Sequence, residues 1–373
     1  MTEHENAYMG PDDGTYSYCD LPVMPEREFG FSIGPGRLSL IRMIDKKWVN
    51  GTVLHYYFFN EETDRELVRK ADGSSEWVTW VGDAEQQNVV REAFQIWKAV
   101  GIGLDFKEVD HREDAEIRIG FMRGDGAWSY VGRDVLKQGE NERTMNFGWD
   151  LTRHAREIDT AIHEIGHTLG FPHEHQNPHA GIVWDEEAVY AALAGPPNRW
   201  SREKTHYNII RKISPDDVQG SNWDNDSVMH YPFGAGMIEE PAEYANGLFP
   251  APGLSARDKT WVTDFYPPLE PEVEELKAFH SVAMDLAPRE QRDFTFKPLI
   301  TRYYNLRTFG RSDTVMVLFK EENGEPRYLT ADDDSGRDEN AYLRLRLFKG
   351  SKYVLRIRLY WRARGGETAV MIW

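Results

Sequence analysis

Cysteine is the rarest residue in this sequence, with Cys19 as its single representative among 373 residues. A lone thiol cannot form a disulfide within the chain, and it excludes zinc sites built on Cys₄ or Cys₂His₂ ligand sets. Long apolar runs are also missing, so the sequence predicts no helix that spans a membrane. The amino-terminal stretch is polar and acidic, without the basic and apolar regions of a secretory signal.

Basic residues are also fewer than acidic residues. The chain has 44 Lys and Arg against 62 Asp and Glu, which gives a formal net charge of −18. Such acidity disfavours nucleic acid and anionic membrane surfaces as partners, because both repel a negatively charged protein. The remaining composition is that of an ordinary globular protein, long enough for two domains at about 150 residues each.

Three regions follow one another along the chain. Residues 1–45 are rich in Pro, Gly and acidic residues without periodicity, so we expect an irregular N-terminal extension. Residues 46–268 mix strand patterns, such as VLHYYFF, with helix patterns, such as DAEQQNVVREAFQIWKAV. After the Pro- and Glu-rich stretch PPLEPEVEE begins, residues 269–373 carry short alternating runs that predict a β-sandwich.

The stretch HEIGHTLGFPH places three histidines at a spacing that suits one metal ion. His163 and His167 are four residues apart, so on a helix their imidazoles project from one face and can bind one zinc ion. Gly170 can leave the helix with a positive φ, and the turn after it brings His173 towards the same metal. Three protein ligands leave one coordination position open, which is typical of catalytic rather than structural zinc.

Glu164 follows the first histidine and projects about 100° further round the helix, where it can reach a water held by the metal. Zinc lowers the pKa of such a water, and Glu164 would take its proton and pass it to a leaving amine. We expect this helix to begin near Asp150 or Thr152, either of which could cap it. Its buried stripe would be Ile158, Ile162, Ile165 and Leu169.

Two other functions are compatible with these residues. The protein could be a latent or inactive zinc-binding protein that serves in binding or adhesion, although zinc retention does not require Glu164. A zinc hydrolase that acts on bonds other than peptide bonds would use the same chemical groups.

At these residues the sequence resembles the metzincin metallopeptidases, and among them the astacin family, whose pattern HExxHxxGFxHE is matched by HEIGHTLGFPHE. Downstream, SVMHYPF resembles the Met-turn of that group. The resemblance covers about Lys46 to Tyr266. It implies an α+β fold, in which a catalytic domain with a twisted mixed sheet and an active-site helix precedes the all-β sandwich. It also implies a zinc metalloendopeptidase (EC 3.4.24 type) acting on peptides or proteins. Matrixins share the longer histidine motif, so a broader metzincin placement stays open.

The same resemblance assigns roles to further residues. Met229 would form an apolar floor beneath the zinc. Tyr231 would be an additional zinc ligand that moves away when substrate arrives and donates to the developing oxyanion. The run EIRIGFMRGDGAWSYVG resembles the edge strand that holds an extended substrate through backbone hydrogen bonds. Its candidate residues are Arg118, Gly120 and Trp128.

The resemblance also suggests that residues 1–45 are a pro-segment. In some metzincins a pro-segment cysteine occupies the open zinc position, and Cys19 is the candidate for that role here. The alternative is that Cys19 is simply a buried small side chain. Asp12 and Asp13 are candidates for the aspartate switch of astacin pro-segments, although GPDDG also suits a plain turn. The family resemblance favours secretion, while the missing signal argues against it.

The last region resembles the pre-peptidase C-terminal β-sandwich domains, chiefly through TADDDSG and LRLFKGSKYVLRIRLYW. Its three consecutive aspartates, Asp332, Asp333 and Asp334, could bind calcium or form a solvated acidic turn. Arginines alternate with apolar residues in two runs, a pattern typical of the solvent face of a sheet, and a docking surface is the alternative. These are Arg344, Arg346, Arg356 and Arg358. No feature of the sequence indicates an oligomeric state.

Overall fold

The computed structural model describes residues 17–24, 46–70, 72–213, 223–269, 273–361 and 364–373. The chain forms two compact units. The first comprises Met1–Trp48, Leu54–Gly101 and Phe106–Val262, and the second comprises Val49–Val53, Ile102–Asp105 and Thr263–Trp373. Within the described residues, none of the helices is long and apolar enough to cross a membrane. The expected fold class is confirmed, since the first unit mixes helices with a sheet and the second is built of strands.

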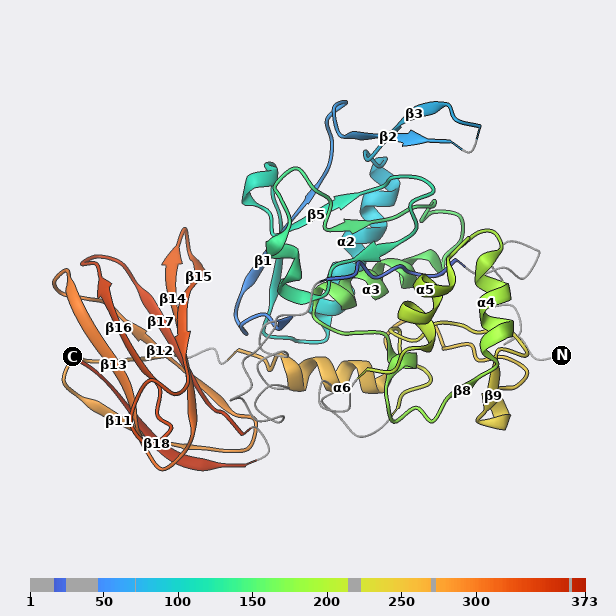
Figure 1. The fold of residues 1–373 in the computed structure, drawn as a ribbon. Helices are drawn as coiled ribbons and strands as arrows, with labels where there is room; N and C mark the ends of the chain where they lie inside the picture. Colours follow the sequence, from blue (N-terminus) through green and yellow to red (C-terminus); the bar gives the residue numbers. More distant parts are fainter. Residues whose placement is uncertain (1–16, 25–45, 71, 214–222, 270–272, 362–363) are drawn as a thin grey trace. The chain divides into compact units, whose positions relative to one another are not determined.

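A five-stranded mixed sheet with the order β4-β1-β5-β7-β6 supports the first unit (Figure 1). Strand β5 pairs in parallel with both β1 and β7, while β6 pairs with β7 in the antiparallel sense. The strands are β1 Val53–Phe58, β4 Asp105–Glu108, β5 Ile117–Gly120, β6 Trp128–Ser129 and β7 Met145–Asn146.

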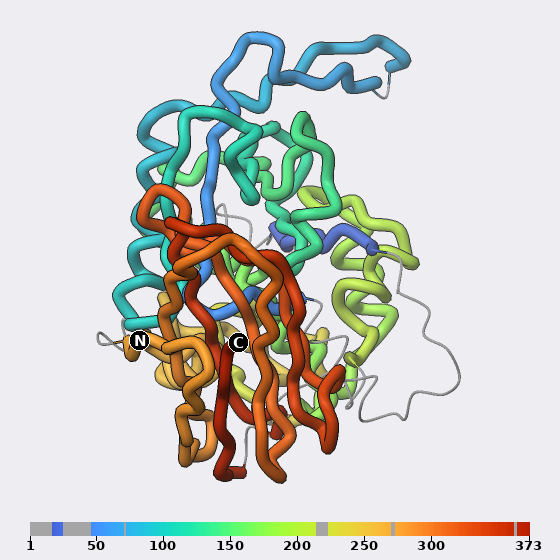
Figure 2. Tube along the Cα trace, turned by 90° about the vertical axis from the view of Figure 1, so that its left-hand side faces the viewer, coloured from blue at the N-terminus to red at the C-terminus, as the bar shows by residue number. Residues whose placement is uncertain are grey.

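Helices and short turns complete this unit. The α-helices are α2 Ala84–Ala99, α3 Glu157–Thr168, α4 Glu186–Ala194, α5 Arg202–Thr205 and α6 Ala256–Phe265, and the last of these continues past Val262 into the second unit. The 3₁₀ turns are η1 Arg112–Asp114, η2 Gly132–Lys137, η3 Glu174–Gln176 and η6 Ala242–Tyr244, and η4 His206–Ile210 is a π-helical turn. Two small hairpins are added, β2 Arg65–Arg69 with β3 Ser75–Thr79, and β8 Val183–Trp184 with β9 Ile238–Glu240. The β2–β3 hairpin projects from the rest of this unit in two perpendicular views (Figure 1, Figure 2).

Helix α3 carries the histidine motif and is fixed from one side by α2. Asp83 caps α2 by accepting a hydrogen bond from the Gln86 amide at 2.9 Å. The fully buried Trp97 of α2 donates its indole hydrogen to the Ile162 carbonyl of α3 at 2.9 Å. This bond links the two helices at the residue that immediately precedes His163.

The start of α3 differs from the expectation. The helix begins at Glu157, not near Asp150 or Thr152. The Asp150 carboxylate instead accepts hydrogen bonds from the amide and hydroxyl of Thr152, which closes a local turn. A short polar side chain followed by a possible donor suits such a turn as well as a helix cap, so the two are hard to separate by sequence.

The second unit is a sandwich of two sheets, with orders β10-β12-β17-β14-β15 and β11-β18-β13-β16 (Figure 1). Its strands are β10 Glu274–Glu275, β11 Ser281–Leu286, β12 Gln291–Phe296, β13 Arg302–Gly310, β14 Thr314–Glu322, β15 Glu325–Asp332, β16 Tyr342–Leu347, β17 Tyr353–Leu359 and β18 Gly366–Ile372. Alternate side chains from both sheets form one buried core, which includes Phe294, Leu306, Leu318, Tyr353 and Ile372. The period-two alternation in the sequence arises because successive side chains of each strand point in turn to the core and to the surface.

One of the alternating arginines departs from the expected pattern. Arg356 of β17 is only 4% exposed and is not on a solvent face. Its guanidinium donates to both carboxylate oxygens of Asp293 on the paired strand β12, at 2.7 and 2.5 Å, and lies over the Phe319 ring. A buried charge is tolerated only with such a partner, and the bidentate geometry provides it.

We predict that Asp293→Asn destabilises the second unit by about 3–5 kcal/mol, because it leaves the Arg356 charge buried without a counter-charge. Urea unfolding of the full chain measures this. Glu322→Gln, which removes the more exposed Lys320 pair of β14, is the control and should cost less than about 1 kcal/mol. Adding Arg356→Met to Asp293→Asn should recover part of the loss. Equal effects of the two single substitutions would contradict the buried-pair argument.

Candidate metal centre

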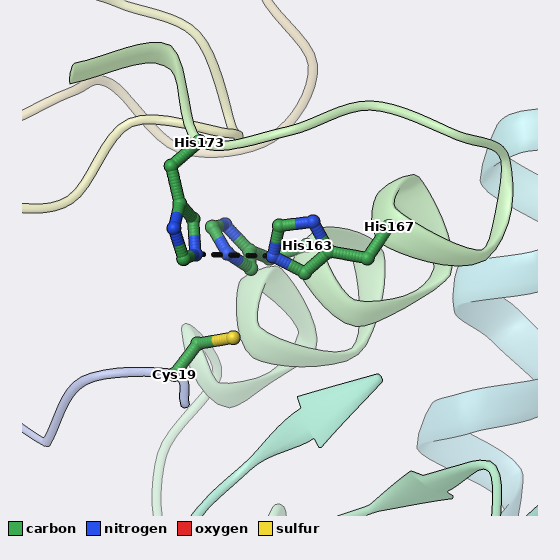
Figure 3. Close-up of side chains that lie close together, drawn as sticks. All are labelled: Cys19, His163, His167 and His173. Carbon is green, nitrogen blue, oxygen red and sulfur yellow. Dashed lines mark hydrogen bonds between the residues drawn. The ribbon is translucent and has the colours of Figure 1, made fainter. Parts of the chain in front are cut away.

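The three histidines of the motif converge at one point in the first unit, together with Cys19 (Figure 3). His163 and His167 project from α3, and His173 returns from the turn that follows it. One ligand atom from each of these four residues lies within 4.8 Å of the others, and all four side chains are buried. Within the described parts of the chain, this is the one such cluster of potential metal ligands.

Backbone carbonyls fix the orientation of two of the rings. Nδ1 of His163 donates to the Val228 carbonyl at 2.7 Å, and Nδ1 of His167 donates to the Phe171 carbonyl at 2.7 Å. Each bond leaves Nε2 unprotonated and directed at the centre, which is how metal-binding histidines are usually held. Gly170 has φ of +100°, so the predicted left-handed exit from the helix is confirmed.

The geometry and the buried nitrogens fit a zinc ion. Nε2 of His167 and Nε2 of His173 are 3.1 Å apart, close to the ~3.3 Å expected for two ligands of one tetrahedral zinc. Nε2 of His163 is buried without a hydrogen-bond partner, which is costly unless a cation satisfies it. Burial lowers the pKa of His163 to about 4 and the pKa of His167 and His173 well below the usual value, which favours the neutral form that binds metal. His163, His167 and His173 can therefore bind one zinc ion.

Glu164 and Tyr231 lie beside this cluster. Glu164 is fully buried, and burial raises the pKa of its carboxyl to about 8. The Tyr231 hydroxyl lies 2.5 Å from Nε2 of His173. A carboxylate and a hydroxyl thus flank the point on which the three imidazoles converge.

Cys19 contacts both of these groups. Its thiol donates to Oε2 of Glu164 at 3.5 Å, and its carbonyl accepts a hydrogen bond from the Tyr231 hydroxyl at 2.7 Å. Burial, followed by the nearby Glu164 charge, raises the pKa of the Cys19 thiol well above its usual value. One residue of the N-terminal segment therefore contacts both Glu164 and Tyr231 and belongs to the ligand cluster itself.

The residues around Cys19 are held from two sides. The Asp20 amide donates to the Ala127 carbonyl at 3.0 Å, next to the strand β6. On the other side the Leu21 amide donates to Oδ1 of Asn208 in the π-helical turn, and the Asp20 carboxylate pairs with Lys204 of α5. Tyr18 and Leu21 are buried in the surrounding apolar cluster. Asp12 and Asp13 lie outside the described residues.

The expected edge strand is only partly right. Trp128 belongs to β6, which is the last strand of the sheet. Arg118 and Gly120, however, lie on β5, which is bonded on both sides, so they are not edge residues. Arg118 is buried and donates to the backbone carbonyls of Ala115, Gln138 and Glu142, which organises the loop before β7. The continuous run of residues hid the change of strand between Gly120 and Trp128.

Sequence reasoning missed the residue that holds the Met-turn. Asp258 of α6 accepts hydrogen bonds from the Ser227 hydroxyl at 2.6 Å and from the Val228 amide at 2.8 Å. The carbonyl of the same Val228 accepts a hydrogen bond from His163, so Asp258 positions a potential metal ligand through this one residue. Asp258 also forms a reciprocal capping pair with Ser255, and that S-x-x-D signature was visible in the sequence.

Gly166 was also missed. A Cβ atom added there would lie 2.3 Å from the Met229 sulfur, so the methionine packs directly on the helix backbone between the two helical histidines. We expected Met229 to form an apolar floor beneath the metal. Its side chain is 4% exposed and packs against Gly166. Only a residue without a side chain allows this approach.

The three aspartates of the second unit show the features of a turn. Oδ2 of Asp332 accepts hydrogen bonds from the Ser335 amide at 3.0 Å and from the Tyr342 amide at 2.8 Å. Among the residues described here, no cluster of potential ligands forms around Asp332, Asp333 and Asp334. Calcium binding at this place stays a prediction.

A mixed sheet, a helix with two histidines and a buried glutamate, and a third histidine that returns from the following turn together define a zinc metalloprotease domain. The family model of Astacin, a family of peptidases, matches residues 78–239, which include the whole histidine motif and the Met-turn. The chain belongs to the astacin family.

Individual relatives agree with this assignment. The chain is 31% identical over 157 residues to zinc metalloproteinase nas-26 of Caenorhabditis elegans, and 27% identical over 218 residues to Tolloid-like protein 1 of Mus musculus. These alignments take in 41% and 53% of this chain but 34% and 19% of the relatives' own length. The solved structure of myroilysin matches with 31% identity and a TM-score of 0.51, covering 60% of this chain and 97% of that one.

We predict that Gly166→Ala destabilises the protein by about 1–3 kcal/mol, because the new methyl group forces Met229 out of its place. Chemical unfolding measures the loss, and zinc content after dialysis reports whether the displaced Met-turn also loosens the metal. Gly234→Ala is the matched control, since it lies three residues after Tyr231 and a Cβ there meets nothing within 4 Å. A stability change of the same size in both variants would refute close packing as the cause.

Proposed function

We propose that this protein is a zinc-dependent endopeptidase in which Glu164 is the general base, Tyr231 stabilises the oxyanion and Cys19 holds the described form latent. The observation that supports this most directly is the convergence of all these groups with His163, His167 and His173 in one buried cluster. Peptides or proteins are the substrate class that the family indicates.

Each group has a task that follows from its position. Zinc bound by the three imidazoles would polarise a carbonyl and lower the pKa of a water or thiol that it holds. Glu164, next to His163 on α3, would accept a proton from the attacking water and return it to the leaving amine. The Tyr231 hydroxyl can donate to an oxygen that becomes negative, and one such donor is typically worth about 10²–10³ in turnover.

The edge strand β6 supplies a way to hold the substrate. Its neighbour Ala127 has a backbone carbonyl that accepts the Asp20 amide in the described form. A substrate backbone could use the same carbonyl, since strand addition depends on main-chain groups and tolerates many side chains. The N-terminal segment and a substrate would then compete for one place.

The same contacts support latency. Cys19 is the fourth member of the ligand cluster, its thiol engages Glu164 and its carbonyl engages Tyr231. Its segment is anchored by Lys204 on one side and by Ala127 on the other. Removal of the segment, or displacement of Cys19, would free the open metal position and both catalytic groups together.

We predict that Glu164→Gln, made in a Cys19→Ala background, lowers the rate of casein cleavage by about 10²–10⁴, the usual contribution of a general base. Zinc measured in both proteins should stay near one ion per chain, because the three ligands are retained. Glu186→Gln, at an exposed position in the first turn of α4, is the control and should leave the rate unchanged. If the Cys19→Ala protein holds zinc and cleaves neither casein nor a peptide library, the endopeptidase proposal fails and an inactive zinc-binding protein is the better description.

We predict that Cys19→Ala raises the cleavage rate of the intact chain at least about tenfold, equivalent to 1.4 kcal/mol of lost competition. Lys204→Ala should give a smaller gain, because it removes one anchor of the segment. Ser17→Ala, two residues before Cys19 and exposed, is the matched control. A second measurement is independent of activity: chelation of zinc should speed the reaction of Cys19 with a thiol reagent. Unchanged rates in both assays would mean that Cys19 is a buried side chain and no more.

A further inference from the structure

One end of the sandwich in the second unit exposes apolar side chains that its core does not use. The loop between β12 and β13 presents Leu299, 84% exposed, and Ile300, 57% exposed. Three aromatic residues surround that loop, and each is also largely solvent-exposed. They are Phe279 at 64%, Tyr303 at 61% and Phe348 at 48%. We call these five residues the apolar tip.

Contacts within the unit place the residues of the apolar tip at the same end of the sandwich. The Lys349 amide donates to the Thr301 hydroxyl at 2.9 Å, which places the β16–β17 turn beside the β12–β13 loop. The Arg302 guanidinium lies 5.5 Å from the centre of the Phe279 ring, which adds the residues before β11. Strands β13 and β16 pair from Arg302 to Leu347 onward, so their tip-side ends coincide. Three separate loops therefore meet at this end of the sandwich.

Basic side chains surround the apolar tip. Arg344 lies over the Tyr303 ring at 5.4 Å, and Arg346 lies over the Phe348 ring at 5.6 Å. The residues of this basic ring are Lys297, Arg302, Arg344, Arg346 and Lys349. The sequence contains no Asp or Glu in residues 276–284, 297–305 or 341–352, which supply the tip and the ring. Within the described residues, none of the five basic side chains forms an ion pair with a carboxylate.

We propose that this end of the sandwich binds the surface of an anionic lipid bilayer. Aliphatic and aromatic side chains on a protruding loop can enter the boundary between headgroups and acyl chains, while arginine and lysine contact the anionic headgroups. The basic ring is complementary in charge to anionic headgroups, although the chain as a whole has a net charge of −18.

The aliphatic residues favour a bilayer over a soluble polyanion. An acidic polysaccharide would use the arginines and could stack on Tyr303 or Phe348, but it gains little from Leu299 and Ile300. Those two residues are among the most exposed large apolar side chains of the described chain. A hydrocarbon boundary is the environment in which their exposure becomes favourable.

The test is co-sedimentation of the full chain with vesicles of phosphatidylcholine alone and of phosphatidylcholine with phosphatidylserine. We expect at least tenfold stronger binding to the anionic vesicles, and weaker binding as salt is raised. The double substitution Leu299→Ser with Ile300→Ser, and the double substitution Arg344→Gln with Arg346→Gln, should each reduce binding at least fivefold. The controls are Leu329→Ser, at an exposed apolar residue of β15, and Arg311→Gln, at the exposed residue that follows the far end of β13.

A spectroscopic readout separates insertion from simple charge attraction. Leu299→Trp should shift its emission to shorter wavelength when anionic vesicles are added, because the indole leaves water. Binding that needs the arginines but neither Leu299 nor Ile300, and that soluble heparin supports equally well, would overturn the bilayer proposal in favour of a soluble polyanion. Equal sedimentation with neutral and anionic vesicles, or none with either, would also overturn it.

Discussion

The centre of the first unit depends on the burial of three imidazole rings around a single point. A buried ring nitrogen without a partner costs free energy of the order of 1–3 kcal/mol, and His163 has such a nitrogen directed at the site. A zinc ion held by His163, His167 and His173 would offset that cost. The local architecture can therefore be understood as the support that keeps three nitrogens at the distances required by one ion.

That support comes from segments that are far apart in the sequence. Helix α2 fixes α3 through Trp97, and the Met-turn packs against Gly166 and holds His163 through the Val228 carbonyl. Asp258 then fixes the Met-turn from the start of α6. His163 and His167 are each held by a main-chain carbonyl, and such outer contacts usually determine how well a site retains its metal.

The sequence was sufficient to predict the metal ligands, because the spacing of His163, His167 and Gly170 maps directly onto helix geometry. It was also sufficient for the sandwich, since period-two alternation records which face of a strand is buried. It could not separate Arg356 from the other alternating arginines, because its burial depends on Asp293 of another strand. The sequence also could not show that Arg118 lies on an inner strand of the sheet, because the order of strands depends on pairing partners far away in the chain. Local periodicity can be detected from the sequence alone, whereas the identity of a neighbour across a sheet depends on the fold.

The net charge of the whole chain differs in sign from the local charge around the apolar tip. A formal charge of −18 predicts repulsion from an anionic surface only if the surface experiences all the charges equally. At physiological ionic strength the screening length is about 8 Å, so a bilayer responds mainly to the side chains that reach it. At the apolar tip those side chains are arginines and lysines beside Leu299 and Ile300, in segments that contain no acidic residue. The composition of a surface within one screening length, and not the total charge, therefore decides which partner it can approach.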